Sequence, residues 1–135
     1  MIKNTIQAWH RLARNRDTEA LDEILADDAV FHSPVVHTPQ KGKAIVKLYL
    51  SGALNVLGSS NFRYVRELIF DNEAVLEFTT EIDGILINGV DMIRWNADGK
   101  IVDFKVMIRP LKAVNLIHNL MGEMLRQGSR NQSEG

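Results

Sequence analysis

Apolar residues near the start of the chain are spaced three or four positions apart, which predicts an amphipathic helix. This stripe consists of Ile2, Ile6, Trp9 and Ala13. Asp17 is placed to cap a second, short helix, because its side chain can accept a hydrogen bond from a free N–H group of the first turn. The apolar positions of that helix are Ala20, Leu21, Ile24 and Leu25. A third helical stripe begins at Lys43 and ends near Gly58.

The pattern changes to strands at residues 29–33 and again after residue 60. Residues 29–33 predict a short strand that follows a break at Asp27-Asp28 and stops at Pro34, since proline cannot donate a ladder hydrogen bond. Residues 35–42 are expected to form a loop. Further strands are predicted at residues 62–70, 74–82, 86–95 and 101–108. Turn residues separate them, and strand 74–82 alternates apolar and polar residues as a two-faced strand does.

The order of these elements predicts an α+β fold. Helices come first and a meander of strands follows, so short turns join antiparallel neighbours, unlike the alternating units of a Rossmann fold. A closing helix is expected after Pro110. Residues 1–127 are therefore predicted to form a single domain, with N-terminal helices packed on a curved, mostly antiparallel sheet. Residues 128–135 contain no apolar side chain and are expected to form a flexible C-terminal tail.

Composition excludes several classes of function. The chain has 135 residues, a formal net charge of -1 and interspersed charges, so no basic field exists to attract nucleic acid or an anionic membrane. It contains no cysteine, which excludes disulfides, thiolate nucleophiles and cysteine metal sites and fits a reducing compartment. No apolar run approaches the roughly 20 residues needed to span a bilayer. We therefore expect a cytoplasmic protein that binds neither nucleic acid nor membrane.

Two segments of the chain resemble those of a known superfamily. Residues 17–34 read DTEALDEILADDAVFHSP, and residues 90–101 read VDMIRWNADGKI. The first is similar to the helix–strand entry, and the second to the penultimate strand and following turn, of the nuclear transport factor 2-like superfamily. Its members include ketosteroid isomerases, SnoaL-like polyketide cyclases and binding proteins. The resemblance extends over residues 4–126 and implies a cystatin-like roll whose curved sheet forms a conical apolar pocket, while the function depends on the site.

The catalytic pattern of the ketosteroid isomerases can be compared with this chain position by position. In those enzymes a carboxylate just before the proline after the first strand takes a proton, and that position is Ser33 here. A tyrosine of the first helix holds the developing enolate, and an ungapped comparison places Trp9 there. The second donor, a protonated acid on the penultimate strand, corresponds to Asp91. A serine without a neighbouring base cannot replace the carboxylate, so steroid isomerisation by that mechanism is not expected.

Asp91 is the strongest candidate for chemistry. It lies in the middle of a predicted strand and shares one face with Gly89, Ile93 and Trp95. A carboxylate in such surroundings is either buried with partners or directed into a pocket. In an apolar pocket its pKa is raised, which makes it a proton donor or a base near neutral pH. The alternative is a structural hydrogen-bonding role or an ion pair with Arg109.

Two histidines lie at and after the end of the first strand. The resemblance places Ser33 inward, so His32 is expected to point away from the pocket. His37 is a candidate acid or base at the pocket mouth. A metal site formed by His32, His37 and Asp91 is an alternative, but their spacing matches no short metal motif. Neither a metal nor another cofactor is therefore predicted.

Aromatic residues are expected to line the pocket as well as to fill the core, since both lie on the concave face of such a fold. The candidate ligand-binding residues are Trp9, Phe31, Ser33, Tyr49, Phe62, Phe78, Trp95 and Arg109. Arg109 stands at the end of its predicted strand, where it could bind a ligand carboxylate or pair with Asp103. His10 and His118 lie on predicted helices and are expected to pack there with hydrogen-bond partners.

The outer face of the predicted sheet also carries apolar residues. Val90 and Met92 point away from the face of Asp91, and Val102 is expected near them on the next strand. Apolar residues on both faces of a strand indicate that the outer face is covered. We expect either a homodimer through the sheet, as in related proteins, or coverage by the C-terminal helix.

Two functions agree with these features. The first is a SnoaL-like enzyme, an isomerase or cyclase that works by acid/base chemistry on a small apolar carbonyl compound, without a cofactor and with Asp91 carrying the proton. The second is a non-catalytic module that binds a hydrophobic ligand or uses its sheet for assembly. Absence of two of the three isomerase residues favours the second, and the lack of a base with an orienting partner does so too.

Overall fold

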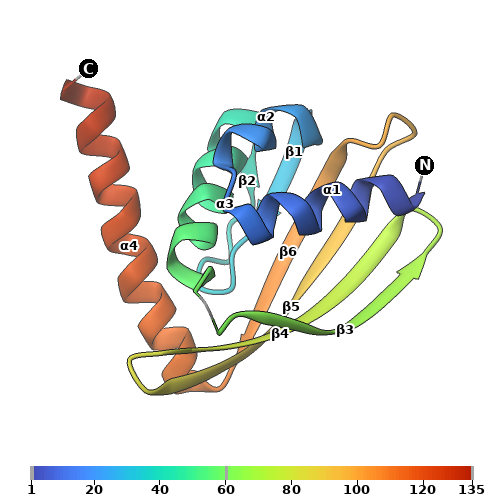
Figure 1. The fold of residues 1–135 in the computed structure, drawn as a ribbon. Helices are drawn as coiled ribbons and strands as arrows, with labels where there is room; N and C mark the ends of the chain where they lie inside the picture. The colour runs from blue at the N-terminus through green and yellow to red at the C-terminus, as the bar shows by residue number, and fades with distance from the viewer. Residues whose placement is uncertain (1, 60, 135) are drawn as a thin grey trace.

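A curved, unclosed sheet of six strands forms one layer of the molecule, and helices cover its concave face (Figure 1). The computed structural model describes residues 2–59 and 61–134, with side chains for residues 4–59 and 61–127. The strand order is β2-β1-β6-β5-β4-β3, and all neighbours are antiparallel except β1 and β6, which are parallel. The bounds are β1 Leu25–His32, β2 Gln40–Lys41, β3 Arg63–Phe70, β4 Glu73–Ile82, β5 Ile85–Trp95 and β6 Ile101–Arg109. The predicted α+β class with a mostly antiparallel sheet is confirmed.

The helices begin and end close to where the sequence predicts. Their bounds are α1 Ile2–Asn15, η1 Thr18–Ala20, α2 Leu21–Ile24, α3 Lys43–Leu57 and α4 Leu111–Glu134. The side chain of Asp17 caps the short 3-10 helix η1 by accepting a hydrogen bond from the N–H of Ala20 at 3.3 Å. Helix α1 crosses the sheet, and α4 stands beside α3 at one side of the molecule (Figure 1).

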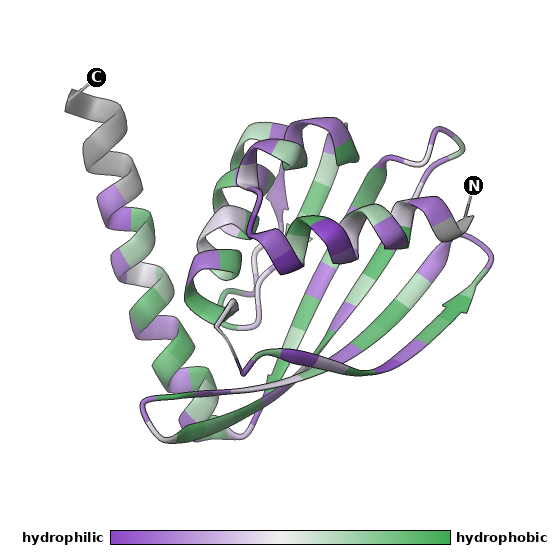
Figure 2. Cartoon of the chain, viewed as in Figure 1, coloured by the Kyte–Doolittle hydropathy of each residue, from purple (hydrophilic) through white to green (hydrophobic). Residues whose placement is uncertain are grey.

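Alternation along the strands builds the core. In β4 the buried residues are every second one from Ala74 to Thr80, and in β5 they include Ile87, Asp91 and Ile93. Apolar and polar segments accordingly alternate along the strands in Figure 2. The largest fully buried side chains come from three different strands: Phe31, Phe78 and Phe104. The concave face of the sheet therefore supplies much of the hydrophobic core.

Strand β1 is longer than the sequence pattern predicts. It begins at Leu25 rather than residue 29, and the exposed Asp27 and Asp28 lie inside it. The parallel register with β6 shifts between Leu25 and Val30, which leaves these two carboxylates outside the regular ladder. The predicted break was wrong because pairing with β6, far away in sequence, holds the backbone extended. The loop expected at residues 35–42 likewise contains β2, which pairs with β1.

The C-terminal helix continues further than its apolar stripe. Its backbone reaches Glu134, whereas the side chains of residues 128–134 and all of residue 135 lie outside the described part of the chain. The flexible tail predicted at residues 128–135 therefore stays a prediction. Ala113, Ile117 and Met121 of α4 are buried in the core beside α3, so α4 does not cover the outer face of the sheet. None of the helices in the described part is long and apolar enough to cross a membrane.

Candidate functional site

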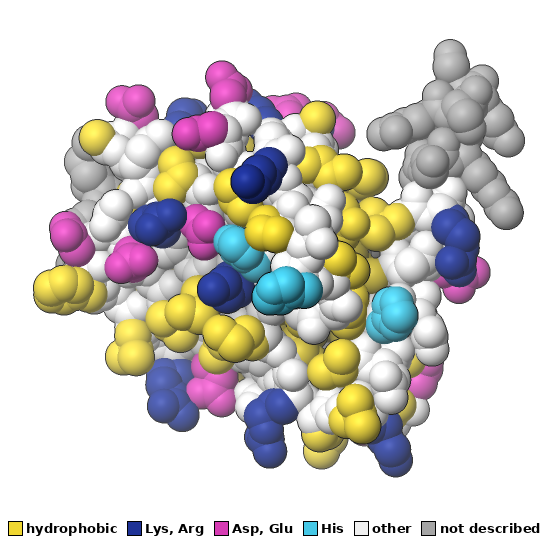
Figure 3. All heavy atoms as spheres, turned by 180° about the vertical axis from the view of Figure 1, so that it is seen from behind, with side chains coloured by type: hydrophobic (Ala, Val, Ile, Leu, Met, Phe, Trp, Pro, Cys, Tyr) yellow, Lys and Arg dark blue, Asp and Glu magenta, His cyan; other side chains and the backbone are white. Residues whose placement is uncertain are grey.

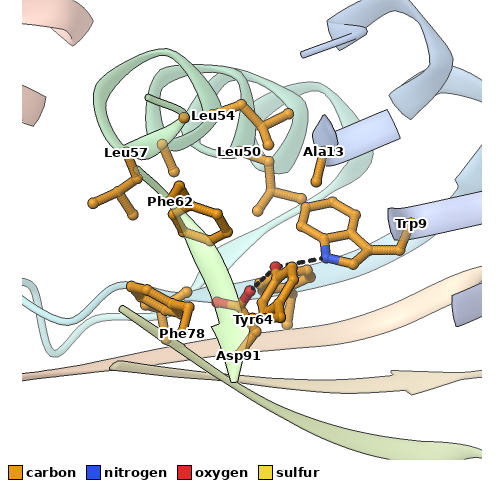
Figure 4. A pocket seen from close by; sticks show the side chains of 13 residues that line it. Trp9, Ala13, Leu50, Leu54, Leu57, Phe62, Tyr64, Phe78 and Asp91 are labelled. Atoms are coloured by element: carbon orange, nitrogen blue, oxygen red, sulfur yellow. Dashed lines mark hydrogen bonds between the residues drawn. The ribbon is translucent and has the colours of Figure 1, made fainter. Parts of the chain in front are cut away.

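Asp91 lies at one end of a chain of three hydrogen-bonded side chains, in which Tyr64 stands between it and Trp9 (Figure 4). The hydroxyl of Tyr64 on β3 donates to Oδ2 of Asp91 on β5 at 2.5 Å. Trp9 Nε1, from α1, donates to the same tyrosine oxygen at 3.0 Å. Three elements that are distant in sequence thus orient one carboxyl group, which is only 6% exposed.

The sheet positions Tyr64 and Asp91 through alternation and register. Tyr64 stands opposite Phe78 in the β3–β4 ladder, and Asp91 stands opposite Leu76 in the β4–β5 ladder. Directly opposed residues of antiparallel strands point to the same face, so all four side chains project inward. Gly89 lies opposite Phe78, and the absence of a side chain there leaves room for the phenylalanine ring.

The side chains of Trp9, Tyr64, Phe78 and Asp91 belong to the wall of an apolar cavity between α1, α3 and the sheet (Figure 4). The cavity has a volume of about 50 Å³. That is space for a few water molecules or for one end of a small ligand. The lining residues are Trp9, Ala13, Leu50, Ala53, Leu54, Leu57, Gly58, Phe62, Tyr64, Phe78, Asp91, Phe104 and Val106.

Burial controls the protonation of both groups. It raises the pKa of Asp91 from 3.8 to about 7, and the hydrogen bond from Tyr64 opposes that rise. It also raises the pKa of Tyr64 well above its usual value, with the adjacent Asp91 carboxylate as the second cause. Tyr64 therefore remains a hydrogen-bond donor at neutral pH. Asp91 titrates near neutral pH, so both its neutral and its ionised form are accessible there.

The second oxygen of Asp91 is the atom that can meet a ligand. Among the described residues, Oδ1 has no hydrogen-bond partner, whereas Oδ2 is bound to Tyr64. In that same part of the chain, no fully buried side-chain oxygen or nitrogen lacks a partner. Oδ1 is therefore open to the cavity rather than enclosed by protein. A carboxyl oxygen in this position can accept a proton from a bound molecule or donate one to it.

The structure brings some of the predicted ligand-binding residues to this cavity and places others elsewhere. Trp9, Phe62, Phe78 and Asp91 line it. Phe31 and Ser33 line a second, smaller cavity of about 20 Å³, which shares Ala53, Leu57 and Val106 with the first. Tyr49 packs against Phe31 with ring centroids 5.6 Å apart, and Trp95 is a buried core residue. Neither Tyr49 nor Trp95 is part of the cavity wall.

The polar residues near the ends of β1 and β6 do not join Asp91. His37 is exposed on the loop after β1, away from the cavity wall. Arg109 is also exposed, and its guanidinium donates to Asn88 at 3.3 Å, so the ion pairs considered with Asp91 and Asp103 were wrong. Alternation places both Arg109 and Asn88 on the outer face of the sheet, opposite to that of Asp91.

Ser33 and the remaining histidines have local partners. Ser33 Oγ accepts a hydrogen bond from the N–H of Val35 at 3.1 Å. His32 points away from the cavity, as expected, and its Nε2 lies 2.9 Å from Oδ1 of Asp103. The alternative metal site is therefore wrong, because His32 and Asp91 lie on opposite faces. Within the described residues, no three acidic or histidine side chains converge as metal ligands.

The two helical histidines differ from each other. His10 has the hydrogen-bond partner expected of it, since its Nε2 lies 2.5 Å from Oε1 of Glu67. Its ring also contacts the ring of Tyr64 edge to face. His118 is exposed on α4, so the packing role expected for it was wrong.

Tyr64 is the site residue that sequence reasoning missed. The ungapped comparison assigned the tyrosine position of the isomerases to Trp9, but Trp9 reaches Asp91 only through Tyr64. Alternation within residues 62–70 could have identified Tyr64 as inward-pointing, since Phe62 and Tyr64 share a face. Nothing in that pattern indicates that β3 lies two strands from β5 and curves over it.

Comparison with known proteins agrees with this architecture. A steroid delta-isomerase from Pseudomonas aeruginosa is 36% identical, with a TM-score of 0.89 over 96% of this chain and 94% of that one. An uncharacterised bacterial protein with a cystatin-like fold, from Silicibacter pomeroyi, is 28% identical, with a TM-score of 0.87 over 96% and 90%. A de novo designed protein with a curved β-sheet shares the fold alone, at 15% identity and a TM-score of 0.69 over 87% and 97%. No curated protein matches the chain at a significant level.

A family model gives the classification. The model of the SnoaL-like domain matches residues 6–104, from α1 into β6. This match covers most of the chain, and the similarity to the two bacterial structures extends over 96% of its length. The resemblance inferred from residues 17–34 and 90–101 is thereby confirmed. The chain belongs to the SnoaL-like domain family of the nuclear transport factor 2-like superfamily.

Proposed function

We propose that this protein binds a small, largely apolar carbonyl compound and moves a proton on it with Asp91, without a cofactor. The observation that carries the proposal is the open Oδ1 of a buried Asp91 whose pKa is about 7. A general acid or base works best when its pKa lies near the working pH. The apolar wall would hold the ligand and exclude water, which strengthens the interaction with the carboxyl group.

One carboxyl group is sufficient for a simple version of this chemistry. In its ionised form Asp91 accepts a proton from the carbon next to the carbonyl, so that a C–H bond breaks and an O–H bond forms on Oδ1. The electron pair moves onto the carbonyl oxygen as an enolate, and Asp91 then returns the proton to the same or a neighbouring carbon. Tyr64 holds Oδ2 throughout and keeps Oδ1 directed into the cavity. The overall result is proton exchange or isomerisation.

The test is the incorporation of deuterium into cyclohexanone and acetophenone in heavy water, followed by proton NMR. We expect exchange above the buffer rate, rising with pH through about 7 as Asp91 ionises. Ser33→Ala is the matched control, because this residue occupies the base position of the isomerases but lines the other cavity. It should leave the rate unchanged. Exchange no faster than in buffer for both ketones, at every pH, would contradict the catalytic proposal.

A non-catalytic ligand-binding role is the second candidate. Among the residues that line the described cavity, Asp91 and Tyr64 are the only titratable ones, so no separate base accompanies the acid. A carrier needs one hydrogen-bonding group and an apolar wall, and this cavity has both. Native mass spectrometry of the purified protein distinguishes a carrier from an enzyme. A small molecule that is retained by the protein, together with an absence of ketone exchange, supports a carrier.

We also propose that the outer face of the sheet associates with a second copy of the chain. Hydrophobic side chains gather on this face between charged ones (Figure 3). Strand pairing assigns to it four residues that expose large fractions of their surface: Leu68 at 61%, Phe70 at 83%, Leu86 at 71% and Met107 at 49%. A sheet face that exposes several large apolar side chains is typical of an association surface. We also propose, from the composition, that the protein is cytoplasmic.

Sedimentation velocity tests the homodimer. We expect the wild-type chain to sediment as a dimer, and Leu68→Lys with Met92→Lys to produce a monomer, because two buried charges would oppose association. The control is Leu111→Lys, since Leu111 is 74% exposed but lies on α4. It should leave the dimer intact. A wild-type chain that stays monomeric at high concentration would rule the dimer out.

A further inference from the structure

A second hollow lies directly outside the Asp91 cavity. It is an open groove of about 450 Å³, lined by His10, Ala13, Arg14, Arg16, Gly58, Ser59, Phe62 and Tyr64. Ala13, Gly58, Phe62 and Tyr64 also line the cavity, so the two spaces adjoin between α1, the end of α3 and the start of β3. The inner cavity has room for only one end of a small molecule, and the rest of such a ligand would lie in this groove.

The groove carries positive charge. Arg14 and Arg16 both line it, and neither forms an ion pair within the described part of the chain. The third basic residue that lines the groove, His10, is already paired with Glu67. The carboxylate of Glu67 is therefore directed to the histidine and not to the arginines. The C-terminal end of α1 adds about half a unit of negative charge, which the two guanidinium groups exceed.

Local backbone geometry directs Arg16 toward the groove. Arg16 follows the last turn of α1 and has a positive φ of 50°, a conformation that turns the chain sharply. Its aliphatic carbons lie beside Gly58, where an added Cβ would come within 3.0 Å of Arg16 Cδ. Glycine at position 58 therefore allows the arginine stem to lie across the rim between the two spaces. Arg16 is exposed and lines the groove, where an arriving ligand can meet it.

From this arrangement we infer that the natural ligand is amphipathic and anionic, with its carbonyl or enol end at Asp91 and a carboxylate held by Arg14 and Arg16. The inference rests on the proposed function for the inner end of the ligand. Guanidinium groups bind carboxylates through paired, charge-assisted hydrogen bonds, which makes them selective for that group. The arginines would also increase the rate at which an anionic ligand reaches an otherwise apolar cavity.

The test uses three probes of similar size that share a phenol, which imitates an enol, and differ in charge at the other end. They are para-hydroxyphenylacetate, the neutral para-ethylphenol and the cationic tyramine, and binding is measured by calorimetry in low salt. We expect the acetate probe to bind roughly 5- to 20-fold more tightly than the neutral one and tyramine to bind most weakly. The preference should decrease at high salt because ions screen exposed charges.

Variants assign the effect to the groove. Arg14→Gln with Arg16→Gln should abolish the preference for the acetate probe and leave the affinity for para-ethylphenol unchanged. Arg11→Gln is the matched control, since Arg11 belongs to the same helix but lines a different groove, beside Asp98 and Lys100. It should retain the full preference. Equal affinity of the wild-type protein for the acetate and neutral probes would overturn the inference, and so would a preference that survives the double variant.

The outcomes also separate this inference from the proposed function. Acetate binding that depends on the arginines but not on Asp91, tested with the apolar replacement Asp91→Leu, would support the anionic groove and contradict the inner site. Binding of the acetate and neutral probes with equal affinity, both weakened by Asp91→Leu, would support the inner site and contradict the groove. A lack of binding by all three probes would contradict both.

Discussion

Replacing Asp91 with asparagine is expected to reduce ketone deuteration at least about 100-fold. The amide has nearly the same shape and its oxygen can still accept the hydrogen bond from Tyr64, but it cannot take up a proton. The rate constants for wild-type and Asp91→Asn proteins, measured by NMR at several pH values, provide the comparison. A variant that exchanges deuterium at the wild-type rate would show that another group carries the proton.

The same substitution has a second expected effect, on stability, which shows that the variant is folded. The pKa of Asp91 is raised in the folded state, so the neutral acid favours folding at low pH, and this contribution is lost as pH rises from about 4 to about 7. A difference of about three pKa units corresponds to roughly 4 kcal/mol of unfolding free energy. Asparagine does not titrate. The unfolding free energy of Asp91→Asn should therefore equal that of the wild-type protein near pH ~4 and exceed it near pH ~8.

Urea unfolding at several pH values between these limits measures this difference. Tyr64 does not interfere, because its pKa is raised above an already alkaline value and it remains neutral throughout the range. Comparison of the two proteins cancels the titration of all other groups that the substitution leaves unchanged. If their unfolding free energies stay parallel across this range, Asp91 does not have the raised pKa on which the proposed chemistry depends.

Gly89→Ala is expected to destabilise the protein by about 3 kcal/mol or more. A Cβ at this position would lie 2.5 Å from Cζ of Phe78 and 2.7 Å from the carbonyl oxygen of Met107. The carbonyl belongs to the adjacent strand β6 and cannot move without disturbing the ladder. The phenylalanine ring is stacked on Phe62 with centroids 5.1 Å apart, and both rings line the cavity. The substitution therefore strains the sheet and displaces the cavity wall together.

Thermal and urea unfolding of Gly89→Ala against the wild-type chain measures the loss. Gly122→Ala is the matched control, because Gly122 lies within helix α4 and the side chain nearest to an added Cβ would be that of Arg126, at 3.7 Å. Alanine favours a helix over glycine by up to about 1 kcal/mol, so the control should be neutral or slightly more stable. Similar behaviour of the two variants would mean that Phe78 does not pack over Gly89.

The sequence by itself determined most of the helices and strands of this protein, apart from the start of β1 and the short strand β2, and the face on which Asp91 lies. Periods of two and of three to four residues report local conformation, so α3, β4 and the capping role of Asp17 were predictable from neighbours in the chain. The resemblance in residues 17–34 and 90–101 was sufficient to identify the superfamily. Alternation within β5 also predicted that Asp91 points inward, away from Val90 and Met92.

Tertiary structure alone decided what surrounds Asp91. The curvature of the sheet brings Tyr64 to it across 27 positions of sequence, and Trp9 reaches Tyr64 across 55. Tertiary packing also places Ser33 in another cavity, and the position of α1 beside the end of α3 and the start of β3 brings Arg14 and Arg16 to the groove. Local sequence patterns predict which face of a strand a side chain points to. They do not predict the strand order or the curvature of the sheet, because long-range packing sets both. For that reason the carboxyl group was predictable, whereas its tyrosine partner and the basic groove were not.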